Sequence, residues 1–116
     1  MKKIGQVQWT ASTLEEARHI ATELVEKKLV ACANIFPHIE SIYIWNGKLE
    51  KGHEIKVILN IRTDLFSLVK EFIEAHCSYE VPAISLIQFE DGNEAFFNWI
   101  SSSTTNSECI HSEKGL

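Results

Sequence analysis

The chain has 116 residues, of which 45% are apolar and 23% charged, as expected for one globular domain. Its formal net charge is -5, which disfavours nucleic acids and anionic membranes as partners because they repel an acidic surface. No apolar run approaches the roughly 18–20 residues that span a bilayer. Residues 1–10 lack the apolar segment of a secretory signal. Three scattered cysteines without a CxxC pair favour reduced thiols and a cytoplasmic location.

Elements at the start of the chain follow from hydrophobic spacing. Alternation over Ile4–Thr10 predicts a strand. Apolar residues at helical spacing predict a helix over Leu14–Lys28, beginning at the capping box formed by Thr13 and Glu16. Ser12 with Glu15 is the alternative register of that box.

The middle of the chain is predicted to be an overlong β-hairpin. Asn46-Gly47 separates two apolar-rich arms, Ala31–Asn46 and Gly47–Ile61, and this dipeptide favours a type I′ turn. Pro37 interrupts the first arm, where we expect a bulge because proline cannot donate to the ladder. Both faces of the hairpin carry apolar side chains, more than one chain of this length can cover. We therefore expect an oligomer.

The second half continues with a helix, a strand and a further helix. Thr63 and Asp64 are candidate N-caps of a helix that ends near His76. Residues 83–89 form a predicted buried strand, and residues 91–93 a turn before a short helix. The predicted inner face of that helix carries Phe96, Trp99 and Ile100.

The resulting order, βαββαβ with a terminal helix, predicts an α+β ferredoxin-like sandwich over residues 1–102. Residues 103–116 are polar and without periodicity, which is typical of a disordered tail. Cys109 and His111 lie in this tail.

Three short strings together resemble one family. Ala31–Asn34 opens the hairpin, residues 41–50 (SIYIWNGKLE) form its tip, and residues 79–82 (YEVP) precede the last strand. In this order the strings are similar to those of the CutA divalent-cation tolerance proteins. The resemblance covers roughly Val7 to Ile100.

The resemblance implies a cytoplasmic homotrimer that is not an enzyme and acts in tolerance of copper and other divalent metals. It also implies a metal or small-ligand site in a cleft between subunits. The architecture is similar to that of the PII signalling proteins, so a PII-like sensor of ligands without physiological metal binding is the alternative.

Matching position by position gives the implied site residues. Those that agree with the family pattern are Cys32, Trp45, Lys48, Glu50, Glu54, Tyr79 and Glu80. Four positions depart from it and are expected at the cleft: Trp9, Asn60, Cys77 and Ala83. Asn60 is kept as a cleft candidate. The resemblance therefore implies that the family scaffold is kept while the chemistry of the site changes.

His76 and Cys77 are the candidate metal ligands, because imidazole and thiolate both suit copper and zinc. Adjacent residues rarely complete a site, so further ligands would come from elsewhere in the chain or from a neighbouring subunit. The alternative is a histidine at a helix C-terminus beside a buried thiol. Cys32 is interpreted as a buried hydrophobe and His38 and His53 as exposed side chains.

The aromatic residues of the hairpin and of the YEVP string are expected to lie at the subunit interface or to line a ligand pocket. Tyr43 and Trp45 are expected at the trimer interface, where aromatic anchors are enriched, and Tyr79 lines either the interface or a pocket. Lys48 with Glu50 or Glu54 forms a cleft ion pair or a solvated rim.

Two other proteins share this topology and are disfavoured. Acylphosphatases need an arginine-bearing phosphate loop after the first strand, and residues 9–12 (WTAS) provide none. RNA-recognition domains need stacking aromatic residues on specific strands together with a basic surface, and this chain is acidic.

Overall fold

The computed structural model describes residues 3–105. The elements run in the order β1 (Ile4–Ala11), α1 (Leu14–Glu26), β2 (Cys32–Trp45), β3 (Lys48–Arg62), η1 (Thr63–Leu65), α2 (Phe66–His76), β4 (Ile84–Gln88) and α3 (Glu94–Ser103). The predicted α+β order is confirmed. Within this part of the chain no helix is long and apolar enough to cross a bilayer.

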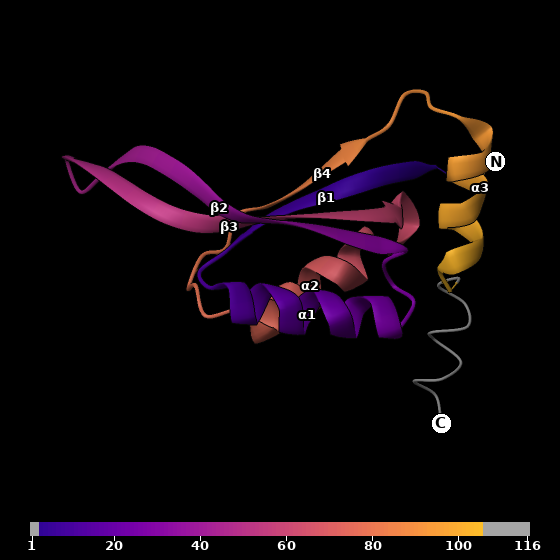
Figure 1. Cartoon of the computed structure of the whole chain (residues 1–116), viewed down its shortest axis with the longest axis horizontal. Coiled ribbons are helices and arrows are strands. Elements are labelled where there is room, and N and C mark those ends of the chain that lie inside the picture. The colour runs from indigo at the N-terminus through magenta and orange to yellow at the C-terminus, as the bar shows by residue number, and fades with distance from the viewer. Residues whose placement is uncertain (1–2, 106–116) are drawn as a thin grey trace.

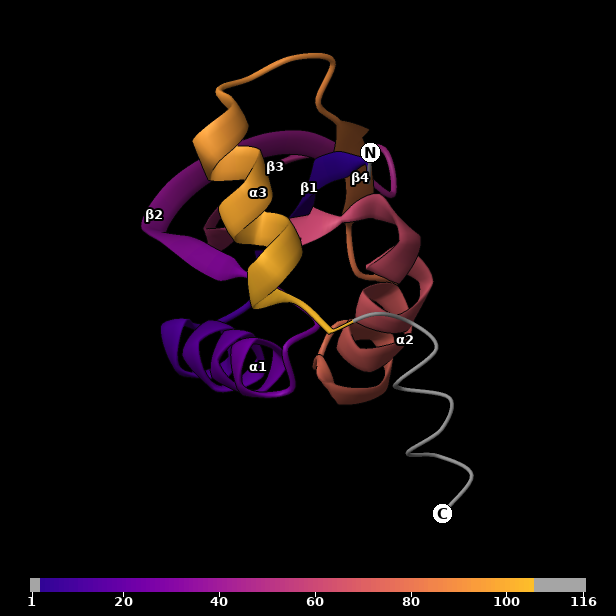
Figure 2. The same cartoon turned by 90° about the vertical axis from the view of Figure 1, so that its right-hand side faces the viewer.

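The four strands form one antiparallel sheet in the order β2-β3-β1-β4, so β2 and β4 are the outer strands. Helices α1 and α2 lie side by side under one face, and the β2–β3 hairpin projects beyond them (Figure 1). Helix α3 lies at the end of the sheet away from the hairpin tip (Figure 1), and Figure 2 views the molecule from that end with α3 in front. This is the predicted ferredoxin-like arrangement.

The core lies between the sheet and helices α1 and α2. Alternation along β1 and β3 points one set of side chains at the helices. These side chains and their helix partners are fully buried, and the set includes Val7, Trp9, Val57, Leu59, Ile61, Leu24, Val69 and Ile73. A smaller cluster of Ile4, Ala31 and Ile100 lies under α3, on the other face of β1.

The hairpin has the predicted turn and the predicted bulge. Asn46 and Gly47 have φ of 53° and 78°, as a type I′ turn requires. A Cβ added at Gly47 would meet nothing within 4 Å, so only the backbone conformation demands glycine there. The β2–β3 register shifts between Phe36 and Ile39, which places the bulge at Pro37.

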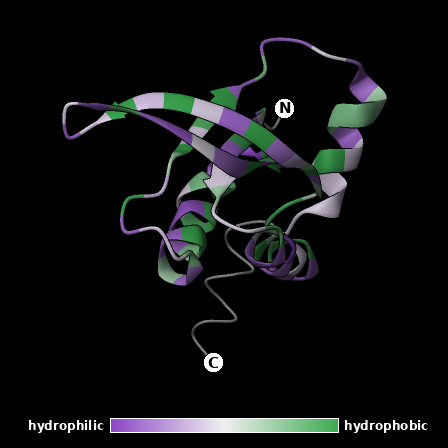
Figure 3. Cartoon of the chain, turned by 60° about the vertical axis from the view of Figure 1, so that its left-hand side comes forward, coloured by the Kyte–Doolittle hydropathy of each residue, from purple (hydrophilic) through white to green (hydrophobic). Residues whose placement is uncertain are grey.

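The hairpin tip leaves large apolar side chains in solvent. Ile42, Ile44, Trp45 and Leu49 are 59%, 72%, 66% and 68% exposed. Figure 3 shows apolar segments along the hairpin where it projects past the helices. Isolated soluble chains rarely expose a contiguous patch of this kind unless another molecule covers it.

A side-chain hydrogen bond fixes the beginning of α1, and a backbone hydrogen bond fixes its end. Thr13 is the N-cap and accepts a hydrogen bond from the Glu16 N–H at 3.1 Å, as predicted, so the Ser12 register is wrong. The helix ends at Glu26 rather than at Lys28. Lys28 takes the left-handed conformation at φ 61°, and the next N–H donates to the Leu24 carbonyl at 3.1 Å, which closes the helix.

The predicted N-caps of α2 are wrong. Residues 63–65 form the 3-10 turn η1, and α2 begins at Phe66. Neither element has a side-chain capping hydrogen bond at its N-cap. Asp64 forms an ion pair with Arg62 at 3.0 Å.

Two predictions about α3 are also corrected. Ile100 is buried and Phe96 half-buried, but Trp99 is 46% exposed and stacks on Phe96. Trp99 lines an apolar groove with Val25 of α1 and Ile35 of β2 instead of entering the core. The helix extends to Ser103, and Thr104 is buried, which is beyond the predicted domain end at residue 102. Cys109 and His111 lie outside the described residues.

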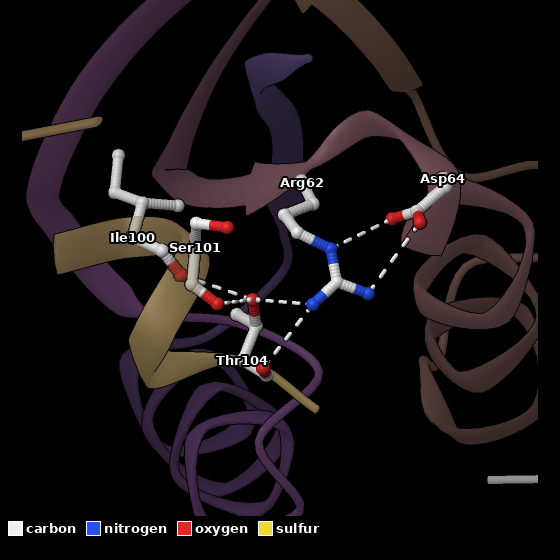
Figure 4. Close-up of polar contacts among 5 residues, drawn as sticks. All are labelled: Arg62, Asp64, Ile100, Ser101 and Thr104. Carbon is white, nitrogen blue, oxygen red and sulfur yellow. Dashed lines mark hydrogen bonds and ion pairs between the residues drawn. The ribbon is translucent and has the colours of Figure 1, made fainter. Parts of the chain in front are cut away.

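Arg62 attaches α3 to the end of β3 (Figure 4). Its side chain is 3% exposed, and Nη1 donates to the carbonyl and hydroxyl oxygens of Thr104 at 3.2 and 3.3 Å. The Thr104 hydroxyl donates to the Ile100 carbonyl at 3.0 Å. The guanidinium therefore lies at the C-terminus of α3, where unpaired carbonyls favour a cation.

Candidate functional site

Tyr79 and Glu54 form the central contact of the candidate site. Tyr79 lies in the loop between α2 and β4, and its hydroxyl donates to Oε2 of Glu54 on β3 at 2.9 Å. Burial, followed by the hydrogen bond and negative charge of Glu54, raises the pKa of Tyr79 to about 12. The phenol therefore remains a protonated donor at neutral pH.

Glu16 joins this region to the start of α1. Its Oε1 accepts from the Ser78 N–H at 2.8 Å, and its Oε2 accepts from the Ser12 hydroxyl at 3.3 Å. The Ser12 and Ser78 hydroxyl oxygens are 2.8 Å apart. The capping box correctly predicted the helix start, but it also predicted that the Glu16 carboxylate bonds back to its own helix. The carboxylate instead ties two loops together.

His76 and Cys77 lie at the end of α2, and both are held by local contacts. His76 stacks on Phe72 at 4.0 Å, and its Nδ1 is 2.8 Å from the Phe72 carbonyl oxygen. Because a carbonyl only accepts, Nδ1 carries the proton and Nε2 is left as the possible ligand. Burial raises the pKa of the Cys77 thiol, which disfavours the thiolate that a metal needs.

The part of the chain that the structure describes contains no complete metal site. Residues 3–105 have no group of three or more His, Cys, Asp or Glu side chains that could hold an ion. A metal ion at His76 and Cys77 would therefore need further ligands from outside these residues.

Cys32 and Asn60 form a second, separate contact. They are register partners on β2 and β3, and the Asn60 Nδ2 donates to the Cys32 sulfur at 3.0 Å. Asn60 is 6% exposed, so this contact is close to the core. About 20 Å of strand separates it from Glu54, at roughly 3.3 Å per residue.

The remaining predicted residues lie on the hairpin tip or in the loop. Lys48 and Glu50 are exposed and are the register partners of Trp45 and Tyr43. Glu80 is exposed in the loop before β4. One chain thus distributes the predicted cleft residues over several places, and a single cleft would require contributions from neighbouring chains.

Trp9 is corrected from a cleft residue to a core residue. Its side chain is 0% exposed, and its indole Nε1 has no hydrogen-bond partner within the described residues. Ala83, by contrast, is exposed, and its carbonyl accepts from the Thr10 N–H at 3.3 Å. Of these two departures from the family pattern, one alters the core and the other the surface.

These features define a class: a small ferredoxin-like α+β protein with a projecting apolar hairpin, in which the predicted cleft residues lie at several separate places within residues 3–105. Comparison with known families gives a match over residues 6–103 to the family described as CutA1 divalent ion tolerance protein. The chain belongs to this family.

Relatives support the assignment in sequence and in structure. The divalent-cation tolerance protein CutA of Archaeoglobus fulgidus is 45% identical over 91 residues, which cover 78% of this chain and 88% of that protein. The CutA1 structure from Ehrlichia chaffeensis superposes with a TM-score of 0.86 at 36% identity, covering 91% of this chain and 99% of that one. The Oryza sativa CutA1 structure gives 0.88 at 31% identity and covers 91% and 97%.

Relatives differ in length and in described location. The Arabidopsis thaliana protein is named chloroplastic and is 33% identical; the match covers 84% of this chain but only 53% of that protein. A structure from Archaeoglobus fulgidus is described as periplasmic. Location therefore varies within the family.

Proposed function

We propose that this chain is a CutA-type homotrimer that acts in the response to divalent metal ions such as copper. In this proposal it is not an enzyme, and it holds a metal ion or a small ligand in a cleft between subunits. The observation that carries the proposal is the projecting hairpin with its exposed apolar tip, within a chain of the divalent ion tolerance family. A second copy of the chain is the simplest cover for that tip.

The intersubunit cleft is proposed to contain Glu54 and Tyr79 of one chain beside tip residues of another. A protonated Tyr79 and the Glu54 carboxylate supply a donor and a charge there. His76 and Cys77 lie next to this contact. The Cys77 thiol donates to the Tyr79 carbonyl at 3.5 Å, and His76 directly precedes Cys77. They are the proposed metal ligands at this place.

A PII-like ligand sensor without physiological metal binding is the second candidate. Two observations favour it: residues 3–105 contain no group of three potential ligands, and burial raises the pKa of the Cys77 thiol. The hairpin and the Tyr79–Glu54 contact serve either function.

The proposed location is the cytoplasm, because Cys32 and Cys77 are free thiols. Fractionation of cells that express the tagged chain tests it, and enrichment in the periplasm would contradict it.

The functional test is a copper titration of the full chain. Wild type is compared with a His76→Ala/Cys77→Ala double variant and with His19→Ala, whose histidine lies exposed on α1 beside Glu23. We expect the double variant to lose about 10–100-fold or more in affinity for one class of sites, while His19→Ala does not. Equal titrations of all three would exclude these ligands and favour the ligand sensor.

A further inference from the structure

Two histidines that lie 15 positions apart in the chain, and whose spacing predicted no contact, are stacked on the hairpin. His38 on β2 and His53 on β3 have ring centroids 4.6 Å apart and ring planes inclined by 25°. Both side chains are exposed. His53 directly precedes Glu54 on β3, so its ring lies on the face of the ribbon opposite the Glu54–Tyr79 contact.

The bulge at Pro37 explains how the two rings meet. Glu40 is the register partner of His53, so the two side chains lie on the same face of the ribbon. His38 is two residues before Glu40 and reaches that face diagonally, at a separation that long side chains can span. His38 lies within the register shift between Phe36 and Ile39, and neither it nor Pro37 has a register partner on β3.

Two imidazoles at this separation have the chemistry of a chelate. Each neutral ring carries one nitrogen with a free lone pair, and both side chains are exposed, so the rings can turn out of the stack and direct both lone pairs at one ion. Imidazole suits copper, nickel and zinc, whereas calcium and magnesium require oxygen ligands.

We propose that His38 and His53 form a two-histidine binding site for a divalent transition-metal ion such as Cu(II) or Zn(II). Residues 3–105 contain no third potential ligand grouped with this pair, so within this part of the chain water would complete the coordination. The bound ion joins β2 to β3 across the bulge and so stabilises the hairpin. This site does not depend on the proposed function, since it uses neither His76 nor Cys77.

The test is a Cu(II) and Zn(II) titration of the full chain carrying Cys109→Ser and His111→Gln, which removes metal ligands from residues 106–116. Into this background are placed His38→Gln, His53→Gln and both together. We expect each single variant to lose about 100-fold in affinity, as much as the double variant, because a chelate needs both rings. His19→Gln is the matched exposed control and should bind like the parent.

A spectroscopic readout and a stability readout check the geometry. Electron paramagnetic resonance of the Cu(II)-loaded parent should show coupling to two nitrogens, and the double variant should lose it. Zn(II) should raise the unfolding temperature of the parent and leave that of the double variant unchanged. The metal-free unfolding temperatures should agree, since both side chains are exposed.

The outcomes separate this proposal from the proposed function. Undiminished metal affinity in the His38→Gln/His53→Gln variant would overturn the site. The site would also be overturned if each single variant lost only part of the affinity and the two losses added up to that of the double variant. If a His76→Ala/Cys77→Ala variant alone lost the metal, this proposal would fail while the proposed function stood. If only the His38 and His53 variants lost the metal, the two-histidine site would stand and the His76–Cys77 site would fail.

Discussion

The hydrogen-bond partners of individual residues in the candidate site could be predicted only in part from the residues next to them in the chain. Tyr79 was predicted from a family string, but its partner was not, because Glu54 lies on a different strand far away in the chain. Glu16 shows the converse. Its spacing from Thr13 predicted the helix start, yet its carboxylate bonds to Ser78, which no local pattern could indicate. Local capping is readable from sequence, whereas long-range pairing needs the fold.

We expect Tyr79→Phe to lower the free energy of unfolding by about 1 kcal/mol at neutral pH, since it removes a hydrogen bond to a charged, half-buried partner. The folded-state pKa of Tyr79 is raised from 10.0 to about 12. The folded state therefore holds this proton more tightly, and the stabilisation is complete below pH 10 and lost as the pH rises toward 12. The difference between wild type and variant should shrink over that window in urea unfolding experiments.

Tyr43→Phe is the matched control, because Tyr43 is 46% exposed on the hairpin tip. Its unfolding curve should follow that of wild type throughout the window. A Tyr79→Phe variant with the same alkaline dependence as wild type would show that the Glu54 contact is absent in solution.

Among the elements, α3 is attached by apolar packing and by a buried cation. Arg62 lies at the end of β3 and reaches the last turn of the helix through both oxygens of Thr104. The cluster of Ile4, Ala31 and Ile100, with Phe89, Phe96 and Phe97 packed against it, provides the apolar contacts. The guanidinium and the Thr105 N–H, which donates to the Lys28 carbonyl at 2.8 Å, hold the C-terminal end of the helix.

Replacing Arg62 by alanine should therefore loosen α3 more than any other element. We expect a loss of about 2–3 kcal/mol, since hydrogen bonds from a charged donor are removed and Thr104 loses its partner in the interior. Hydrogen exchange should accelerate in residues 94–103 before it does so in β1 or β3.

Arg18→Ala provides the comparison, because that arginine is exposed on α1 and should change stability by less than about 0.5 kcal/mol. If α3 kept its protection in Arg62→Ala, the apolar cluster and the Thr105–Lys28 backbone hydrogen bond would account for its docking without the guanidinium.

The elements themselves were largely predictable, because hydrophobic period, capping and turn residues act locally. The strand at β1, helix α1 and the type I′ hairpin with its bulge all followed from such signals. The start of α2 did not follow from such signals, because the Asp64 carboxylate pairs with the Arg62 guanidinium instead of capping the N-terminus of the helix. Trp99 was misplaced for a similar reason: helical periodicity cannot tell a core-facing stripe from one that lines an open groove.

For the whole molecule, the hairpin is the feature that one chain cannot satisfy. Its arms are 14 and 15 residues long, and its tip extends past both covering helices (Figure 1). The predicted cleft residues are likewise dispersed in one chain. An assembly that covers the tip would address both features, which is why trimer formation is the first property to test.

We expect Trp45→Ala to weaken the proposed trimer by about 2–4 kcal/mol, because exposed aromatic side chains at interfaces act as binding anchors. Light scattering over a dilution series should show the variant dissociating at higher concentration than wild type. Lys51→Ala, an exposed position on the same hairpin, should dissociate like wild type. A wild-type chain that is monomeric at micromolar concentration would contradict the trimer itself.

Pro37 limits how other strands can add to this molecule. As an outer strand, β2 offers unpaired backbone groups along one side, which is the usual template for uncontrolled strand addition and aggregation. Proline has no N–H, and the bulge turns the neighbouring groups out of line. An incoming strand can therefore pair with the segment before the bulge or with the segment after it, but not continuously across both, so the same residue that shapes the hairpin restricts the chain to short, specific partners.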